Sequence, residues 1–249
     1  TGSAVGLGNI WKFPYITGEN GGGAFVFVYL VCVVAMGIPI MMAETMLGKR
    51  GHKNPISTMA TLAGEARANP AWKYLGWMGV LAGVIILSYY SVIAGKTIHY
   101  IARILTGLLW DLDLAGAEAA IDGLNGSIFL LTLWHTLFIG LTMYIVMQGV
   151  NGGIEKAVEF LMPGLFLILM VLVVYAAMSD GFQQGIDFMF TVDFGSLSAD
   201  SILMALGQAF FTLSLGMGAI MVYGSYLPPD VSIAKTSTIV ALCDTLVAI

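Results

Sequence analysis

The stretch from Ala4 to Tyr15 places the tightest constraint on what this chain can fold into. It is apolar enough to lie in a membrane, yet Gly6, Gly8 and Asn9 interrupt it. Hydrocarbon offers no hydrogen-bond partners, so a membrane-spanning helix must satisfy its own backbone, and glycine weakens a helix. Carbonyl groups freed by a break are tolerated at membrane depth only around a protein-lined cavity. Because hard cations prefer oxygen ligands, these carbonyls and the Asn9 side chain indicate a small-cation site.

The composition argues against a soluble fold. Hydrophobic residues make up 58% of the chain and charged residues 10%, whereas soluble domains carry roughly 25% charged residues. The two cysteines, Cys32 and Cys243, lie in apolar stretches and are interpreted as membrane-buried thiols rather than a disulfide framework. With the opening stretch, we expect seven spans of about 20 residues each. The other apolar runs cover 23–47, 75–95, 128–149, 157–178, 202–226 and 234 onward.

Loop charges predict the orientation. The 49–73 connection carries five basic residues and one acid, Glu65, whereas the 107–127 and 179–200 loops each carry four acids and no Lys or Arg. Positive loops stay in the cytoplasm, so we expect a cytoplasmic amino end and two acidic outer loops. Because the chain opens inside a membrane segment and ends at Ile249 within an apolar run, we also expect a fragment of a longer protein.

A second interrupted span lies far downstream, at 207–218. An apolar helix is broken there by Gly216 and Gly218, with the hydroxyls of Thr212 and Ser214 just before the break. Glycines of this kind also allow close helix packing. Two matched glycine pairs, each beside polar oxygens, instead favour a functional polar site inside the membrane.

Together, the motifs at 4–25 and 207–218 resemble the first and sixth helices of the neurotransmitter:sodium symporter family. The resemblance implies an all-α, multi-span membrane protein with an inverted-repeat, leucine-transporter-like fold and broken first and sixth helices. Residues 1–249 would then be part of a single transmembrane domain. Residues 1–178 would form the first five-helix repeat, and residues 179–249 an outer loop with the first two helices of the second repeat.

The resemblance also implies where substrate and sodium bind. An amino-acid carboxylate would meet the backbone at the first break and the Tyr90 hydroxyl, since helix N-termini favour anions. Aromatic and polar groups of the sixth helix would hold the rest of the substrate, with Ile86 lining the side-chain pocket. Taken alone, the tandem tyrosines at 89–90 are more typical of packing than of ligand binding. The implied substrate-binding residues are Ala4, Leu7, Gly8, Ile86, Tyr90, Phe211, Thr212, Ser214 and Met217.

Two sodium sites are implied, and no organic cofactor. The first would use Ala4, Asn9, Thr212 and the substrate carboxylate, so that ion and substrate raise each other's affinity. The second would use the carbonyls of Gly2 and Val5, with its other ligands on an eighth helix outside this sequence. Asp244, the single acid in the apolar run from Val231 to the end, is predicted to place a negative charge near the first ion. An aspartic acid hydrogen-bonded to neighbouring helices, or kept protonated by burial, is the alternative. Chloride-dependent family members have Asn or Ser around this position, so the resemblance predicts chloride-independent transport.

Gate and coupling residues follow from the same resemblance. Lys12 and Gln208 match the outer gate, although the family more often has Arg at the Lys12 position, and Lys lacks the bidentate fork of Arg. Glu44 matches a glutamate that braces the sixth-helix break, but a carboxylate reaching the membrane interface is an alternative interpretation. Gly153 and Pro163 match a fifth-helix unwinding motif, and an ordinary helix start followed by a proline kink explains them equally well.

We therefore expect a sodium-coupled symporter for neutral hydrophobic or aromatic amino acids, in a prokaryotic inner membrane. A transporter-like sensor that binds without flux is the alternative. Enzyme activity is not expected, because His52, His99 and His135 are scattered and no Gly-x-Ser-x-Gly or His-Glu-x-x-His motif occurs. The acidic balance excludes nucleic-acid binding, and nothing repeats as a channel pore would require. The expected partners are membrane lipid and the amino acid, with the protein a monomer or weak homodimer.

Overall fold

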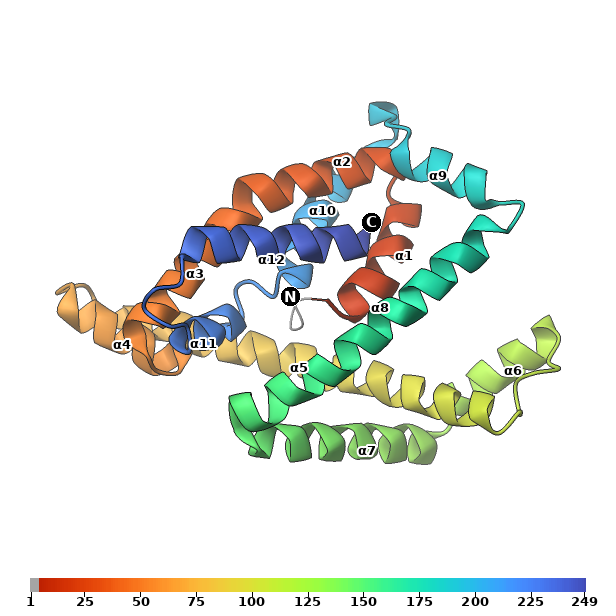
Figure 1. Ribbon diagram of the computed structural model, residues 1–249, viewed down its shortest axis with the longest axis horizontal. Coiled ribbons are helices and arrows are strands. Elements are labelled where there is room, and N and C mark those ends of the chain that lie inside the picture. Colours follow the sequence, from red (N-terminus) through yellow and green to blue (C-terminus); the bar gives the residue numbers. More distant parts are fainter. Residues whose placement is uncertain (1–4) are drawn as a thin grey trace. The chain divides into compact units, whose positions relative to one another are not determined.

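The computed structural model describes residues 5–249, and within that range the secondary structure is helical, with no strands (Figure 1). Its α-helices are α1 Phe13–Glu19, α2 Gly23–Cys32, α3 Ile38–Gly51, α4 Pro55–Glu65, α5 Lys73–Leu105, α6 Leu114–Asn125, α7 Ile128–Met147, α8 Glu155–Ala177, α9 Phe182–Phe190, α10 Ala199–Thr212, α11 Ala219–Ser225 and α12 Ile233–Ala248. Short π-helical or 3₁₀ turns are η1 Gly8–Lys12, η2 Val33–Gly37, η3 Pro70–Trp72, η4 Val150–Ile154 and η5 Phe194–Ser196.

Four helical segments in the described range are long and apolar enough to cross a membrane. They are Gly23–Gly51, Pro70–Leu105, Ile128–Met147 and Gly152–Ala177. The apolar run at 202–226 is divided between α10 and α11, so it does not form one long helix, whereas in the opening run η1 leads directly into α1. An interrupted helix is thus present where Gly216 and Gly218 predicted it, and in the described part of the opening run residues 5 and 6 form a bend before the helix begins.

Helix starts follow the local sequence. The Asn54 side chain accepts a hydrogen bond from the Ser57 amide at 2.9 Å, and Pro55 occupies the first turn of α4, where its missing N–H costs nothing. Ser198 caps α10 in a reciprocal pair with Ser201. These caps fix where the helices begin after each loop.

Contacts between residues divide the chain into two compact units, which are described separately. The first contains residues 1–83 and 164–249, and the second contains residues 84–163. Both interrupted helices belong to the first unit.

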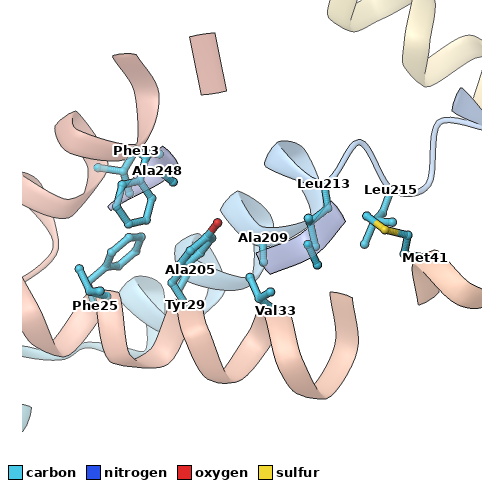
Figure 2. Close-up of a cluster of buried hydrophobic side chains, with 13 residues drawn as sticks. Phe13, Phe25, Tyr29, Val33, Met41, Ala205, Ala209, Leu213, Leu215 and Ala248 are labelled. Atoms are coloured by element: carbon cyan, nitrogen blue, oxygen red, sulfur yellow. The ribbon is translucent and has the colours of Figure 1, made fainter. Parts of the chain in front are cut away.

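A buried cluster forms the core of the first unit, where side chains from α1, α2, α10 and α12 meet (Figure 2). Phe13, Phe25 and Tyr29 are fully buried, and the ring of Phe13 lies 4.8 Å from that of Tyr29 and 6.4 Å from that of Phe25. Ala205 and Ala209 give α10 a small-residue face on which the larger side chains of α2 pack. The core therefore fixes the interrupted helices against α2.

Helices α3 and α11 approach each other through their backbones. A Cβ added at Gly48 would overlap the Met221 carbonyl group, and one added at Gly224 would lie 2.6 Å from the Thr45 carbonyl oxygen. At the cytoplasmic end predicted from the loop charges, Lys49 Nζ donates to the carbonyls of Pro229 and Val231, at 2.9 and 2.8 Å. Since only glycine permits this approach, α11 is held closely to α3.

The second unit has its own helix crossing. Gly95 of α5 lies against the backbone of Trp134 and His135 in α7, where an added Cβ would be 2.8 Å from the His135 nitrogen. The His99 ring stacks edge-on against Trp134, with centroids 5.4 Å apart. Lys96 Nζ donates to Asn125 Oδ1 at 2.7 Å and so links α5 to α6.

Candidate ion and substrate site

The side chain of Asn9 satisfies a backbone amide at the first break. Asn9 Oδ1 accepts a hydrogen bond from the Gly6 amide at 3.1 Å, and the main chain continues as the π-turn Gly8–Lys12 before α1 begins. Asn9 is 1% exposed. An amide oxygen has two lone pairs, so one acceptor position of Asn9 remains available to a ligand.

The second break runs from Leu213 to Gly218, between α10 and α11. Ser214, Gly216 and Gly218 adopt positive φ angles of 55°, 81° and 77°. The two glycines adopt this conformation at no steric cost, whereas Ser214 is held there by its surroundings. Six residues between two helices thus leave irregular backbone, and this is the local arrangement that the sequence predicted.

The two interrupted helices meet α12 at a buried carboxylate. Asn9 Nδ2 donates to Asp244 Oδ1 at 2.8 Å and to the Asp244 carbonyl at 3.0 Å. Asp244 is fully buried, and its Oδ2 has no hydrogen-bond partner in the described part of the chain. Among residues 5–249, Arg50 and Glu65 form the one ion pair, so this carboxylate faces no cationic side chain there. A buried negative charge in that setting is suited to binding a cation.

Sequence reasoning missed two residues beside this carboxylate. The Tyr29 hydroxyl of α2 shares a 3.3 Å hydrogen bond with Thr212 Oγ1, and Thr245 Oγ1 is buried without a partner in the described range. Thr212 also donates to the Gln208 carbonyl at 3.1 Å. The available signals were a tyrosine inside an apolar span and a threonine next to the single acid of its helix. Thr212 also interacts with the Asp244 side chain, and Tyr29 with Asp244 and Thr245, so oxygens from α2, α10 and α12 lie near one another.

The predicted gate residues Lys12 of η1 and Gln208 of α10 each contact the other's helix. Gln208 Nε2 donates to the Gly8 carbonyl at 2.9 Å, while its Oε1 is buried without a partner in the described range. Lys12 Nζ lies 4.0 Å from the centroid of the Phe211 ring, within the range of a cation–π interaction. Gly8 packs on the same ring, since a Cβ added there would lie 3.1 Å from it. The Phe211 ring therefore contacts both Gly8 and the Lys12 ammonium.

Glu44 reaches the second break from α3. Glu44 Oε1 accepts a hydrogen bond from the Gly216 amide at 2.7 Å, and Glu44 is 8% exposed. A carboxylate accepting a backbone N–H stabilises an amide that the broken helix cannot satisfy. This is the contact that the bracing interpretation of Glu44 requires, and the role of Glu44 stays a prediction.

The remaining predicted residues are distributed across both units. Val5 is buried, Met217 and Ser214 are half-buried in the second break, and Leu7 directly precedes the π-turn of the first break. Ile86 and Tyr90 lie on the part of α5 that belongs to the second unit, with the ring of Tyr90 6.4 Å from that of Tyr89. Gly2 and Ala4 lie outside the described residues.

The fifth-helix pair, Gly153 and Pro163, lies in a helical segment. Gly153 is in the π-turn η4, where a Cβ would overlap the Ile145 carbonyl, and Pro163 is inside α8. The structure thus contains a helix start and an internal proline here, and unwinding remains a prediction.

Long apolar helices, the interruption between α10 and α11, and a buried polar site where it meets η1 and α12 define a multi-pass membrane protein of the broken-helix kind. The chain belongs to the sodium:neurotransmitter symporter family, whose model matches residues 1–115 and 122–249. It is 37% identical over 248 residues to the sodium-dependent transporter YhdH of Bacillus subtilis, covering 100% of this chain and 54% of that protein. It is 26% identical to the sodium-dependent neutral amino acid transporter B(0)AT3 of Mus musculus, covering 100% of this chain and 44% of that protein.

The fold has a solved counterpart. The crystal structure of MhsT in complex with L-phenylalanine superimposes with a TM-score of 0.92 at 43% sequence identity, covering 99% of this chain and 55% of MhsT. This agreement confirms the predicted all-helical, leucine-transporter-like fold. The chain spans about half the length of the relatives it matches.

Proposed function

We propose that the protein containing this chain is a symporter that couples sodium entry to import of neutral hydrophobic or aromatic amino acids. The observation that carries the proposal is the meeting of Asn9, Thr212 and Asp244 where two interrupted helices and α12 come together. The names of the relatives, several of which are sodium-dependent transporters, support this interpretation.

The first sodium ion is proposed to bind between Asn9, Thr212 and Asp244, with the Ala4 carbonyl and the substrate carboxylate completing the site. Sodium favours oxygen ligands, and all of these groups present oxygen. Because substrate and ion share a contact, binding of either one raises the affinity for the other by the same factor. A second ion would use the carbonyls of Gly2 and Val5.

Asp244 is proposed to replace a mobile anion. A sodium ion at membrane depth is costly unless a negative charge lies close by. At about 4 Å and an effective dielectric of about 20, the attraction between two unit charges is roughly 4 kcal/mol. The buried Asp244 carboxylate supplies that charge covalently, and transport is therefore proposed to be independent of chloride.

The substrate pocket is proposed to be apolar, with Ile86, Tyr90, Phe211 and Met217 around the amino-acid side chain. Backbone at Leu7 and Gly8 with the Tyr90 hydroxyl would hold the carboxylate, and carbonyls near Phe211, Thr212 and Ser214 the ammonium. MhsT, a relative at 43% identity, was crystallised with L-phenylalanine. A charged side chain would lose its hydration in such a pocket without gaining a partner.

The gates are proposed to use the contacts already described. Lys12 over the Phe211 ring and Gln208 on the Gly8 carbonyl would close the outer side, while Glu44 holds the second break. Gly153 and Pro163 would allow the inner end of the fifth helix to unwind.

Equilibrium binding of labelled L-phenylalanine to the purified full-length protein tests the proposed site. We expect saturable binding in sodium and none when potassium or choline replaces it. Sodium-independent binding would contradict the proposal. A sensor that binds without flux would share this behaviour. One human relative carries the name of an inactive sodium-dependent neutral amino acid transporter. Flux measurements separate the two functions.

A further inference from the structure

The second helix contains a wide turn whose cause is Pro39. Proline has no N–H, so the Ala35 carbonyl lacks its usual donor four residues ahead. The chain responds with the π-turn Val33–Gly37, in which the Ile38 amide donates to the Val33 carbonyl five residues back. Such π-turns are rare and often mark functional positions.

Leu213 lies against this turn from the opposite helix. Leu213 is the C-cap residue directly after α10, its side chain is fully buried, and it belongs to the same core cluster as Val33 (Figure 2). A Cβ added at Gly37 would lie 2.6 Å from Leu213 Cδ1. Since the Leu213 side chain is enclosed, it has little space into which to retreat. The π-turn and Gly37 therefore form a socket for Leu213.

The position of Leu213 fixes its two neighbours. Thr212 precedes it, with Oγ1 bonded to Tyr29, and Ser214 follows it with a φ of 55°. A shift of the Leu213 backbone would move both neighbours, because one planar peptide unit joins Leu213 to Thr212 and another joins it to Ser214. The far end of the break is held separately, by Glu44 on the Gly216 amide and by Gly79, whose added Cβ would lie 3.2 Å from the Gly216 oxygen. Leu213 thus holds the α10 end of the second break, where the hydroxyls of Thr212 and Ser214 lie.

We propose that Gly37 is a positioning residue: the socket it opens for Leu213 sets where α10 ends and so places Thr212 and Ser214 for ion and substrate. This inference rests on the proposed function, since it assigns a role to those two residues. Gly37 touches neither ligand. The nearest atom to a Cβ added at Gly37 is Leu213 Cδ1, so a substitution there would act on Thr212 and Ser214 through Leu213. The role of Gly37 can therefore be tested without changing the binding groups themselves.

Gly37→Ala in the full-length protein is the primary test. The added methyl group should displace Leu213 and raise the apparent KM for sodium and for L-phenylalanine by about tenfold, an effect of overpacking. The maximal rate per folded molecule should change by less than about twofold, because the binding groups are misplaced rather than lost. Gly64→Ala is the matched control: Gly64 is exposed on α4, and an added Cβ meets nothing within 4 Å. It should leave both constants unchanged.

Leu213→Val supplies the decisive second variant. It shortens the side chain in the socket, so Gly37→Ala with Leu213→Val should recover both KM values to within about threefold of the parent, as a volume-conserving exchange does. If Gly37→Ala does not fold, the double variant should restore both folded yield and binding. Independent, additive losses in the double variant, or a Gly37→Ala variant that matches the parent, would overturn the socket. A parent that shows no sodium-dependent binding would instead refute the proposed function.

Discussion

The side-chain amide of Asn9 donates two hydrogen bonds to a single residue, Asp244, at 2.8 Å to its carboxylate and 3.0 Å to its main-chain carbonyl. The two residues are 235 positions apart in the sequence. One contact therefore joins the first helix break to α12, beside Thr212 at the end of α10. A cation bound there would contact three helices at once, which is how binding of one ion can bias the arrangement of several elements.

Asp244→Asn tests the source of the negative charge. The amide preserves the shape of the side chain and an acceptor for Asn9 but removes the charge, so uptake should fall at least about tenfold without chloride, as expected for loss of a nearby counter-charge. Chloride should restore part of it. The measurement is a chloride titration of parent and variant in gluconate buffer. Chloride-dependent parent uptake, or a variant fully active without chloride, would remove Asp244 from the ion site.

Glu44→Ala should weaken the second break. It leaves the Gly216 amide without its acceptor, at a cost of about 1–3 kcal/mol for an unsatisfied buried group. Glu44→Gln keeps an acceptor oxygen and should lose much less. Melting temperature and sodium-dependent phenylalanine affinity, measured on both variants, distinguish the two. Equal losses in the alanine and glutamine variants would show that charge, and not the hydrogen bond, is what matters at this position.

Gly48→Ala should destabilise the protein, although alanine is usually favoured over glycine in a helix by about 1 kcal/mol. The added Cβ would overlap the Met221 carbonyl of α11, a backbone group that cannot move aside. We expect a net loss of about 1–3 kcal/mol, seen as a lower melting temperature. Gly64→Ala, where the added Cβ meets nothing within 4 Å, should be neutral or stabilising. A Gly48→Ala variant as stable as that control would show that α3 and α11 are less closely packed.

Competition against labelled phenylalanine tests the proposed pocket. Leucine, tyrosine and tryptophan should displace it, whereas glutamate and lysine should not, since a desolvated charge without a partner costs several kcal/mol. Met217→Phe should weaken tryptophan more than leucine, because methionine adapts to irregular space and a phenylalanine ring does not. Stronger competition by glutamate or lysine than by leucine would refute an apolar pocket.

Much of this arrangement was predictable from the sequence, because breaks in membrane helices leave a clear signature. Gly216 and Gly218 predicted the interruption between α10 and α11, and the family motif around Asn9 predicted the fold. The roles assigned to individual site residues remain predictions, although the structure does bring Asn9 and Thr212 to the Asp244 side chain.

Long-range contacts were the part that the sequence could not supply. Tyr29 on Thr212 and Gly37 opposite Leu213 each pair residues more than 170 positions apart, and nothing local marks either partner. The π-turn before Pro39 shows why: a proline predicts a departure from α-helical bonding, but only the packing partner decides what form it takes.

Uptake by proteoliposomes of the full-length protein tests the central claim of sodium coupling most directly. Labelled L-phenylalanine should accumulate inside vesicles when an inward sodium gradient is imposed, and Asn9→Leu, which removes the oxygen and the link to Asp244, should abolish that accumulation. Binding in sodium without accumulation would identify a sensor. Full uptake driven by a proton gradient alone, with sodium absent, would contradict the account.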